Sequence, residues 1–102
     1  MLRSIKVTTT ATDEDILLNT NVQKRICERL GIADSDYSKA LNGNGIKMDL
    51  TISFSATNKI SINNGLFDDL FEDSIYTLGM KTPIKSVKIK TPATFFVLID
   101  VD

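Results

Sequence analysis

The clearest pattern in the chain is an unbroken alternation of apolar and polar residues from Ile46 to Ala56. A two-residue period of this kind predicts a strand of an antiparallel sheet, with one face on the core and the other in water. The turn-forming pair Thr57-Asn58 follows at once, and the pattern resumes at Ile60 and Ile62. Together these segments predict a hairpin.

Three further segments carry strand patterns. Residues Leu2–Thr10 alternate with β-branched side chains on one face, which indicates a strand near the amino terminus. In Ser86–Thr91, Val87 and Ile89 alternate with lysines, and outward lysines are typical of an exposed sheet edge. Ala93–Val101 is apolar on both faces over most of its length, which predicts a central strand buried on both sides.

Two segments have the period of a helix instead. From Asn19 to Gly31 an apolar residue recurs at every fourth position, and Gly31 stands where a helix commonly ends. A strand over Val22–Ile26 remains an alternative for part of this segment. From Gly65 to Ser74, apolar and acidic residues segregate as they do on a two-turn amphipathic helix.

Five or more short strands with one or two brief helices fit a single domain covering residues 1–102. The predicted fold is mainly β: a small antiparallel β-sandwich, jelly-roll-like, with one or two short helices and with the first and last strands in its core.

Composition and charge remove several classes of function. The formal net charge is −1, so there is no concentration of Lys and Arg of the kind that nucleic acid binding needs, and we expect no nucleic acid partner. No apolar run is long enough to cross a bilayer or to act as a secretory signal, so we expect no membrane partner and synthesis in the host cytoplasm. The sequence contains no His, which is the commonest general base and metal ligand.

The remaining residues form no recognisable catalytic motif. Cys27 is the only cysteine, so neither an intrachain disulfide nor a Cys-based zinc site can form. Without a His as base, this thiol is expected to be a buried structural group. We therefore expect a protein that is not an enzyme and that has no catalytic residues, no metal and no cofactor.

The consecutive acids Asp13, Glu14 and Asp15 are a candidate metal site, because carboxylates suit Ca²⁺ and Mg²⁺. On an extended chain, however, neighbouring side chains point to opposite sides and do not converge on one ion. We expect these acids to keep the chain exposed to solvent where it leaves the first strand. Ile16 and Leu17, which follow them, are expected to pack either on the core or on a neighbouring subunit.

Two charged segments suggest a protein interface. Phe67 and Phe71 lie one turn apart on the expected acidic helix, as in acidic-hydrophobic docking motifs, although the helix could instead close the end of the sandwich. Lysines between positions 81 and 90 form a basic cluster, or simply protect a sheet edge. An acidic and a basic patch on one small domain favour head-to-tail self-association or docking on a repetitive lattice. The expected interface residues are Ile16, Leu17, Phe67, Asp68, Asp69, Phe71, Glu72, Asp73, Lys81, Lys85, Lys88 and Lys90.

The stretch Thr8–Thr12, the acidic-apolar turn Asp13–Leu18 and the polar pair Asn19-Thr20 carry a family resemblance. With the order of the strands, they resemble the decoration, cement and minor structural proteins of bacteriophage capsids. The resemblance implies a β-sandwich that oligomerises or binds the capsid shell through sheet edges and loops, and it implies no catalytic residues. It also implies extended structure over residues 22–45, where the sequence itself predicts a helix and a loop.

The expected function is therefore that of a non-enzymatic structural protein of a phage or virus particle, either a capsid decoration protein or a minor capsid component. Such a protein would act through contacts with capsid or other virion proteins, would reside in the virion, and is expected to form homo-oligomers. The alternative is a small regulatory binding protein, encoded by a phage or bacterium, that inhibits a host enzyme through its acidic-hydrophobic surface.

Overall fold

The computed structural model describes residues 4–79 and 83–101, which form eight strands and two α-helices. The strands are β1 (Ser4–Thr8), β2 (Glu14–Asp15), β3 (Met48–Ser53), β4 (Asn58–Ile62), β5 (Asp68–Leu70), β6 (Ile75–Leu78), β7 (Val87–Ile89) and β8 (Thr94–Val101). The helices are α1 (Thr20–Leu30) and α2 (Tyr37–Asn42), and a 3-10 turn precedes each of them, at Ile16–Leu18 and Asp34–Asp36.

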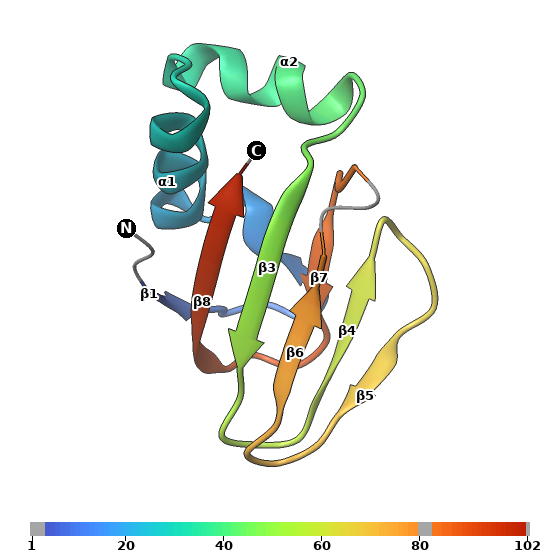
Figure 1. Cartoon of the computed structure of the whole chain (residues 1–102). Helices are drawn as coiled ribbons and strands as arrows, with labels where there is room; N and C mark the ends of the chain where they lie inside the picture. Colours follow the sequence, from blue (N-terminus) through green and yellow to red (C-terminus); the bar gives the residue numbers. More distant parts are fainter. Residues whose placement is uncertain (1–3, 80–82, 102) are drawn as a thin grey trace.

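The strands build two four-stranded antiparallel sheets that pack face to face, with α1 and α2 gathered at one end (Figure 1). The strand order is β1-β8-β3-β6 in the first sheet, sheet A, and β2-β7-β4-β5 in the second, sheet B. Along the chain the strands alternate between the sheets, except that β4 and β5 are consecutive in sheet B. This order is that of a jelly roll, so the predicted mainly-β sandwich is confirmed.

Inward-facing side chains of both sheets fill the interior. On β3, the buried residues Met48, Leu50 and Ile52 alternate with more exposed polar residues, as the sequence predicts. Ile60 of β4 and Ile89 of β7 belong to the same core from the side of sheet B. The period-2 pattern therefore reports the buried face of β3 correctly.

The central strand β8 is buried on one face only. It lies between β1 and β3, and it turns Phe95, Val97 and Ile99 to the core. Phe96 points outward and is about half exposed. The prediction that this strand is buried on both sides is wrong, because no element of the described residues covers sheet A at Phe96 and this side chain meets solvent.

The predicted hairpin between residues 46–56 and 60–62 is also wrong, because β3 and β4 lie in different sheets. Residues 54–57 carry the chain across the sandwich, and Phe54 fills the interior at the crossing, with its ring centroid 4.7 Å from that of Phe95. Alternation specifies the buried face of a strand but not its neighbour. Pairing within a hairpin and crossing to the other sheet satisfy the same pattern.

The helix predicted for residues 65–74 is wrong as well, since this segment contains the short strand β5. Asn63 and Asn64 both have positive φ, 52° and 59°, which is the geometry of a turn that joins two antiparallel strands. The turn folds β5 back onto β4, with Asp69 opposite Lys59. An isolated helix of this length is marginal in water, whereas pairing with an existing strand satisfies the backbone at once.

Helix α1 lies within the segment Asn19–Gly31 that the sequence predicts, and it ends before Gly31 as expected. The Oδ1 atom of Asn19 accepts hydrogen bonds from the N–H groups two and three positions ahead, and Gly31 ends the helix with a φ of 69°. The strand alternative for this segment is therefore wrong. Arg29 forms an ion pair with Asp100 and so ties the helix to β8. Together α1 and α2 make much of residues 22–45 helical, so the extended structure implied by the resemblance is wrong there.

Ile16 and Leu17 pack on the core rather than on another subunit. Both are fully buried, in a 3-10 turn that Asp15 caps by accepting a hydrogen bond from the N–H of Leu17. The hydroxyl of Tyr37 donates to the carbonyl oxygen of Leu17 at 2.7 Å, and burial raises the pKa of this phenol well above its usual range. The two residues expected at an interface are therefore core residues.

The neighbours Leu17 and Leu18 offer a matched test of this turn, because they are 0% and 66% exposed. We expect Leu17→Ala to lower the free energy of unfolding by about 2–5 kcal/mol, since it opens a cavity in the core. We expect Leu18→Ala to change it by less than about 0.5 kcal/mol. Urea denaturation followed by circular dichroism measures both values, and equal losses would contradict the packing described here.

Candidate functional site

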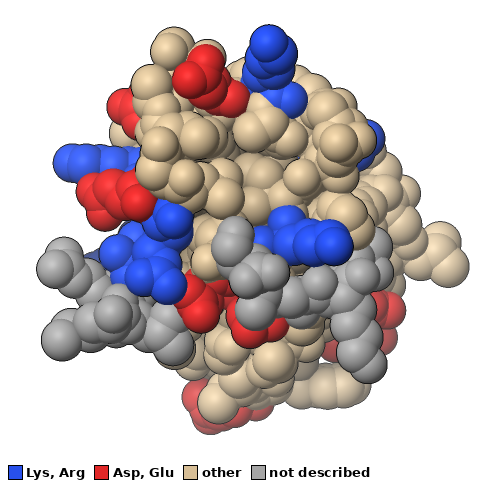
Figure 2. Space-filling view, turned by 45° about the horizontal axis from the view of Figure 1, so that its top comes forward, with Lys and Arg blue, Asp and Glu red and all other residues tan. Residues whose placement is uncertain are grey.

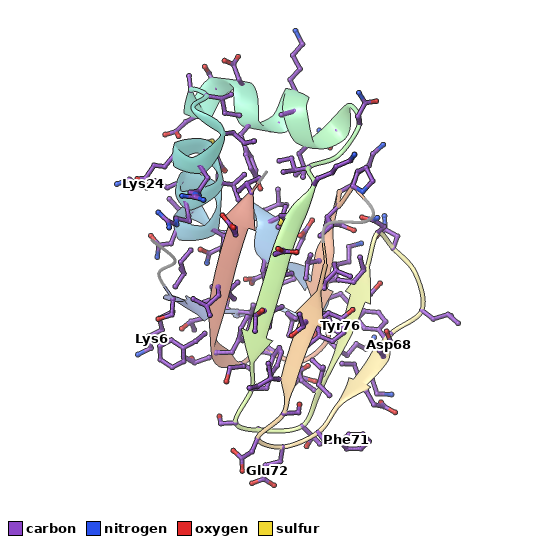
Figure 3. All side chains as sticks on the ribbon, viewed as in Figure 1. Lys6, Lys24, Asp68, Phe71, Glu72 and Tyr76 are labelled. Atoms are coloured by element: carbon purple, nitrogen blue, oxygen red, sulfur yellow. The ribbon has the colours of Figure 1, made fainter. Side chains whose placement is uncertain are left out.

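The strongest candidate for a functional site is the surface formed by residues 66–73 together with Lys59 and Lys90, which we call the β5 surface. Leu66 is 93% exposed and Phe71 is 69% exposed, although both are large apolar side chains. Figure 3 shows Phe71 and Glu72 at the end of the molecule opposite the helices. Exposed apolar side chains that gather within one short segment are typical of interaction sites.

Backbone and side-chain contacts hold the β5 surface in place. Leu70 is buried and anchors β5 to the core. In the connection before β5, the hydroxyl of Ser61 donates to the carbonyl oxygen of Gly65 at 2.7 Å. Across the strand pair, the Nζ atom of Lys59 lies 3.7 Å from Oδ1 of Asp69, an exposed ion pair that contributes little to stability. The exposed apolar side chains thus lie in the segments that directly flank an anchored strand.

A hollow of about 440 Å³ lies between β4, β5 and the residues that follow β7. Its lining residues are Thr57, Asn58, Lys59, Asp69, Leu70, Phe71, Lys90 and Thr91. Lys90 reaches over it, with Nζ 5.0 Å from the centroid of the Phe67 ring and 3.3 Å from Oδ1 of Asp13. The hollow therefore offers an apolar wall beside fixed charges of both signs.

The expected interface residues divide into three groups. Phe67, Asp68, Asp69, Phe71, Glu72 and Asp73 do lie together, on the β5 surface. Lys90 lies on the same surface. Lys88 is in β7, opposite Asp15 of β2, and Lys85 is exposed in the loop that precedes β7. Lys81 lies outside the described residues. Figure 2 shows acidic and basic side chains intermixed on the face it displays, rather than a field of one sign.

Sequence reasoning missed three residues of interest. Lys59 was assigned only to the predicted hairpin, although it lines the hollow beside Asp69. Ile75 of β6 and Phe96 of β8 are large exposed side chains on the outer face of sheet A, and both flank Ser53 of β3. The only available signal was strand alternation, which places Phe95 and Phe96 on opposite faces of the sheet.

The three consecutive acids take separate partners. Asp13 pairs with Lys90, and Oε1 of Glu14 accepts hydrogen bonds from the N–H groups of Thr10 and Ala11. Oδ1 of Asp15 accepts from Leu17 and also from the N–H of Val87 on β7. Within residues 4–79 and 83–101, no three His, Cys, Asp or Glu side chains are grouped as metal ligands.

The single thiol is placed as a structural group. Cys27 is buried on α1, and both burial and the nearby carboxylate of Asp34 raise the pKa of its thiol. A raised pKa disfavours the thiolate, which is the nucleophilic form.

In the described part of the chain, no helix is long and apolar enough to cross a bilayer.

Comparison of this chain with protein-family models, with curated proteins and with solved structures finds no match.

The pH dependence of stability tests the placement of Asp15. Burial raises the pKa of its carboxyl above the ordinary value of 3.8, although hydrogen bonds from Val87 and Leu17 act in the opposite direction. Since the folded chain binds this proton more tightly, the carboxyl favours folding below the unfolded pKa, and this contribution is lost as pH rises through the folded pKa. Asp15→Asn keeps an Oδ1 acceptor for both N–H groups and does not titrate. We expect the stability of this variant relative to the wild type to increase from about pH 3 to about pH 7.

Two further variants complete this test. Glu72→Gln removes one exposed acid and controls for the loss of a charge. Asp15→Ala removes both hydrogen bonds and should lower the free energy of unfolding by about 1–3 kcal/mol. Urea denaturation at several pH values gives all the differences. An Asp15→Asn variant whose relative stability falls with rising pH would contradict the assigned environment.

Proposed function

We propose that this protein is a non-enzymatic structural component of a phage or virus particle, and that it binds a capsid or other virion protein through the β5 surface. The observation that carries the proposal is the exposure of Leu66 and Phe71 in the segments on either side of β5, whose own residue Leu70 is buried. Exposed aromatic side chains of this kind commonly act as anchors that a partner buries.

The chemistry of the β5 surface indicates the chemistry of the partner. Among the described residues, the ion pairs reach only Asp69 of its four acids, and Asp68, Glu72 and Asp73 are exposed. A partner with an apolar pocket for Phe71, rimmed by Lys or Arg, would complement this arrangement. Burial of the aromatic ring would supply affinity, and opposite charges at the rim would set the register.

The jelly-roll fold supports the proposal of a particle protein, but the fold alone does not assign this role. Jelly rolls recur in viral capsid proteins, and also in lectins and cupins, so the fold by itself does not define an activity. The 102 residues contain no His, and therefore cannot supply a His-ligated metal centre. The resemblance of the first 22 residues to phage capsid accessory proteins points to the same class. Location in the virion and a homo-oligomeric state belong to this proposal.

A matched pair of variants tests the proposal, because Phe71 and Leu18 are 69% and 66% exposed at separate places on the surface. Phe71→Ser should reduce the number of copies of the chain in purified particles by about tenfold or more at limiting protein concentration, as the loss of an aromatic anchor requires. Leu18→Ser should leave that number unchanged. Quantitative mass spectrometry of the particles measures both, and circular dichroism confirms that each variant is folded.

Two outcomes would contradict this proposal. One is equal incorporation of the Phe71→Ser and Leu18→Ser variants, which would exclude the β5 surface. The other is absence of the wild-type chain from particles. In that case, capture of a host enzyme by the wild-type chain but not by the Phe71→Ser variant would establish the regulatory alternative, which uses the same acidic and apolar side chains.

A further inference from the structure

The four strands at the sheet edges differ in how they are protected against pairing with another chain. In sheet A the edges are β1 and β6, and in sheet B they are β2 and β5. β1 carries Lys6 and packs beside α1, β2 has only two residues, and β5 contains Asp68 and Asp69. Charge, shortness and coverage are the usual means of blunting an edge. β6, with the sequence Ile-Tyr-Thr-Leu, has no charged residue.

The hydrogen bonding of β6 to β3 shows which backbone groups face outward. The N–H of Phe54 donates to the carbonyl oxygen of Ser74 at 3.1 Å, next to the paired residues Ser53 and Ile75. In an antiparallel ladder, successive residues direct their backbone groups to opposite sides. The backbone N–H and C=O groups of Ile75 and Thr77 therefore point away from β3, toward the free edge of the sheet.

The side chains of β6 are also incompletely covered. Ile75 is 70% exposed on the outer face, and Tyr76 and Leu78 are only partly buried although they face the core. Figure 3 shows Tyr76 near Asp68 of β5, at the open side of the sandwich. The carboxylate of Asp68 is close enough to contribute, after burial, to the raised pKa of Tyr76. Within the described residues, this edge thus has backbone groups without a strand partner and exposed apolar surface.

We propose that β6 pairs antiparallel with β6 of a second copy of this chain, about a twofold axis at Tyr76. Ile75 of each copy then lies opposite Thr77 of the other, and the outward N–H and C=O groups of these two residues form four backbone hydrogen bonds across the axis. The two copies of sheet A become one continuous sheet. Tyr76 meets its counterpart at the axis, and the partly exposed side chain of Leu78 becomes covered.

The absence of charge on β6 favours pairing of this edge with its own copy. Because β6 is uncharged, antiparallel self-pairing brings no like charges together along the strand. The same arrangement at β5 would place carboxylates of Asp68 and Asp69 opposite one another, which is unfavourable. Contacts that join identical patches about a twofold axis are also the commonest way in which soluble proteins associate. This inference does not depend on particle binding, since Phe71 belongs to the loop after β5 and not to the edge of β6.

The test uses a pair of double variants matched in charge, sheet and face. Ile75→Lys with Thr77→Lys sets lysine opposite lysine across the proposed axis, and lysine is a natural block of strand pairing. Ser4→Lys with Thr8→Lys adds the same charge to exposed outward positions of β1, at the opposite edge of sheet A. We expect a dimer of the wild-type chain and of the β1 variant by sedimentation equilibrium up to about 1 mM, and a dissociation constant at least about tenfold higher for the β6 variant.

Residue-resolved hydrogen exchange of the wild-type chain gives a second readout that needs no variant. Exchange of the Ile75 and Thr77 amides should slow as protein concentration rises, whereas exchange of the Lys6 and Thr8 amides on β1 should not change. A wild-type chain that is monomeric at about 1 mM, or a dimer that leaves the Ile75 and Thr77 amides unprotected, would overturn the proposal. So would a dimer of equal affinity in a folded Ile75→Lys, Thr77→Lys variant.

Discussion

The pairing of the first and last strands, β1 and β8, in sheet A is the constraint on which the rest of the structure depends. β8 bonds to β1 on one side and to β3 on the other, and Thr9 and Ala93 continue this ladder beyond the strands, with the N–H of Thr9 2.8 Å from the carbonyl oxygen of Ala93. Between these two strands the chain changes sheet at each successive strand, except from β4 to β5. This long-range closure explains why such a short β2 can persist, since it serves mainly to carry the chain across the sandwich.

Local patterns predicted those elements whose form is determined by their own residues. The apolar period and the terminal residue Gly31 located α1, and strict alternation identified the buried face of β3. The same patterns could not give strand neighbours, because a strand shows the same alternation whichever sheet it joins. β5 was mistaken for a helix for a related reason. The four apolar residues of the segment 65–74 fit a helical stripe, yet only Leu70 is buried, and the turn at Asn63 and Asn64 decides the outcome.

The candidate site could be predicted in composition but not in arrangement. The acidic and aromatic residues between positions 67 and 73 were identified as an interface from their chemistry, and they do lie on one surface. From the sequence, we expected an acidic patch and a separate basic patch. In the structure, Lys90 instead packs on Phe67 and pairs with Asp13. This contact could not be predicted, because it depends on the order of strands in sheet B. For the same reason, the exposed edge at Ile75 emerged only from the three-dimensional structure.

The two proposed surfaces lie on different sheets. A dimer through β6 would therefore present two copies of the β5 surface and could bind a repetitive lattice at two points, which would increase its avidity.

The central claim is that a particle protein buries the β5 surface. Hydrogen exchange of the chain in assembled particles, compared with the free chain, tests this claim most directly. The account predicts slower exchange of the backbone amides in residues 66–73, with no change in the turn that contains Leu18. Protection confined to any other part of the described chain would contradict it.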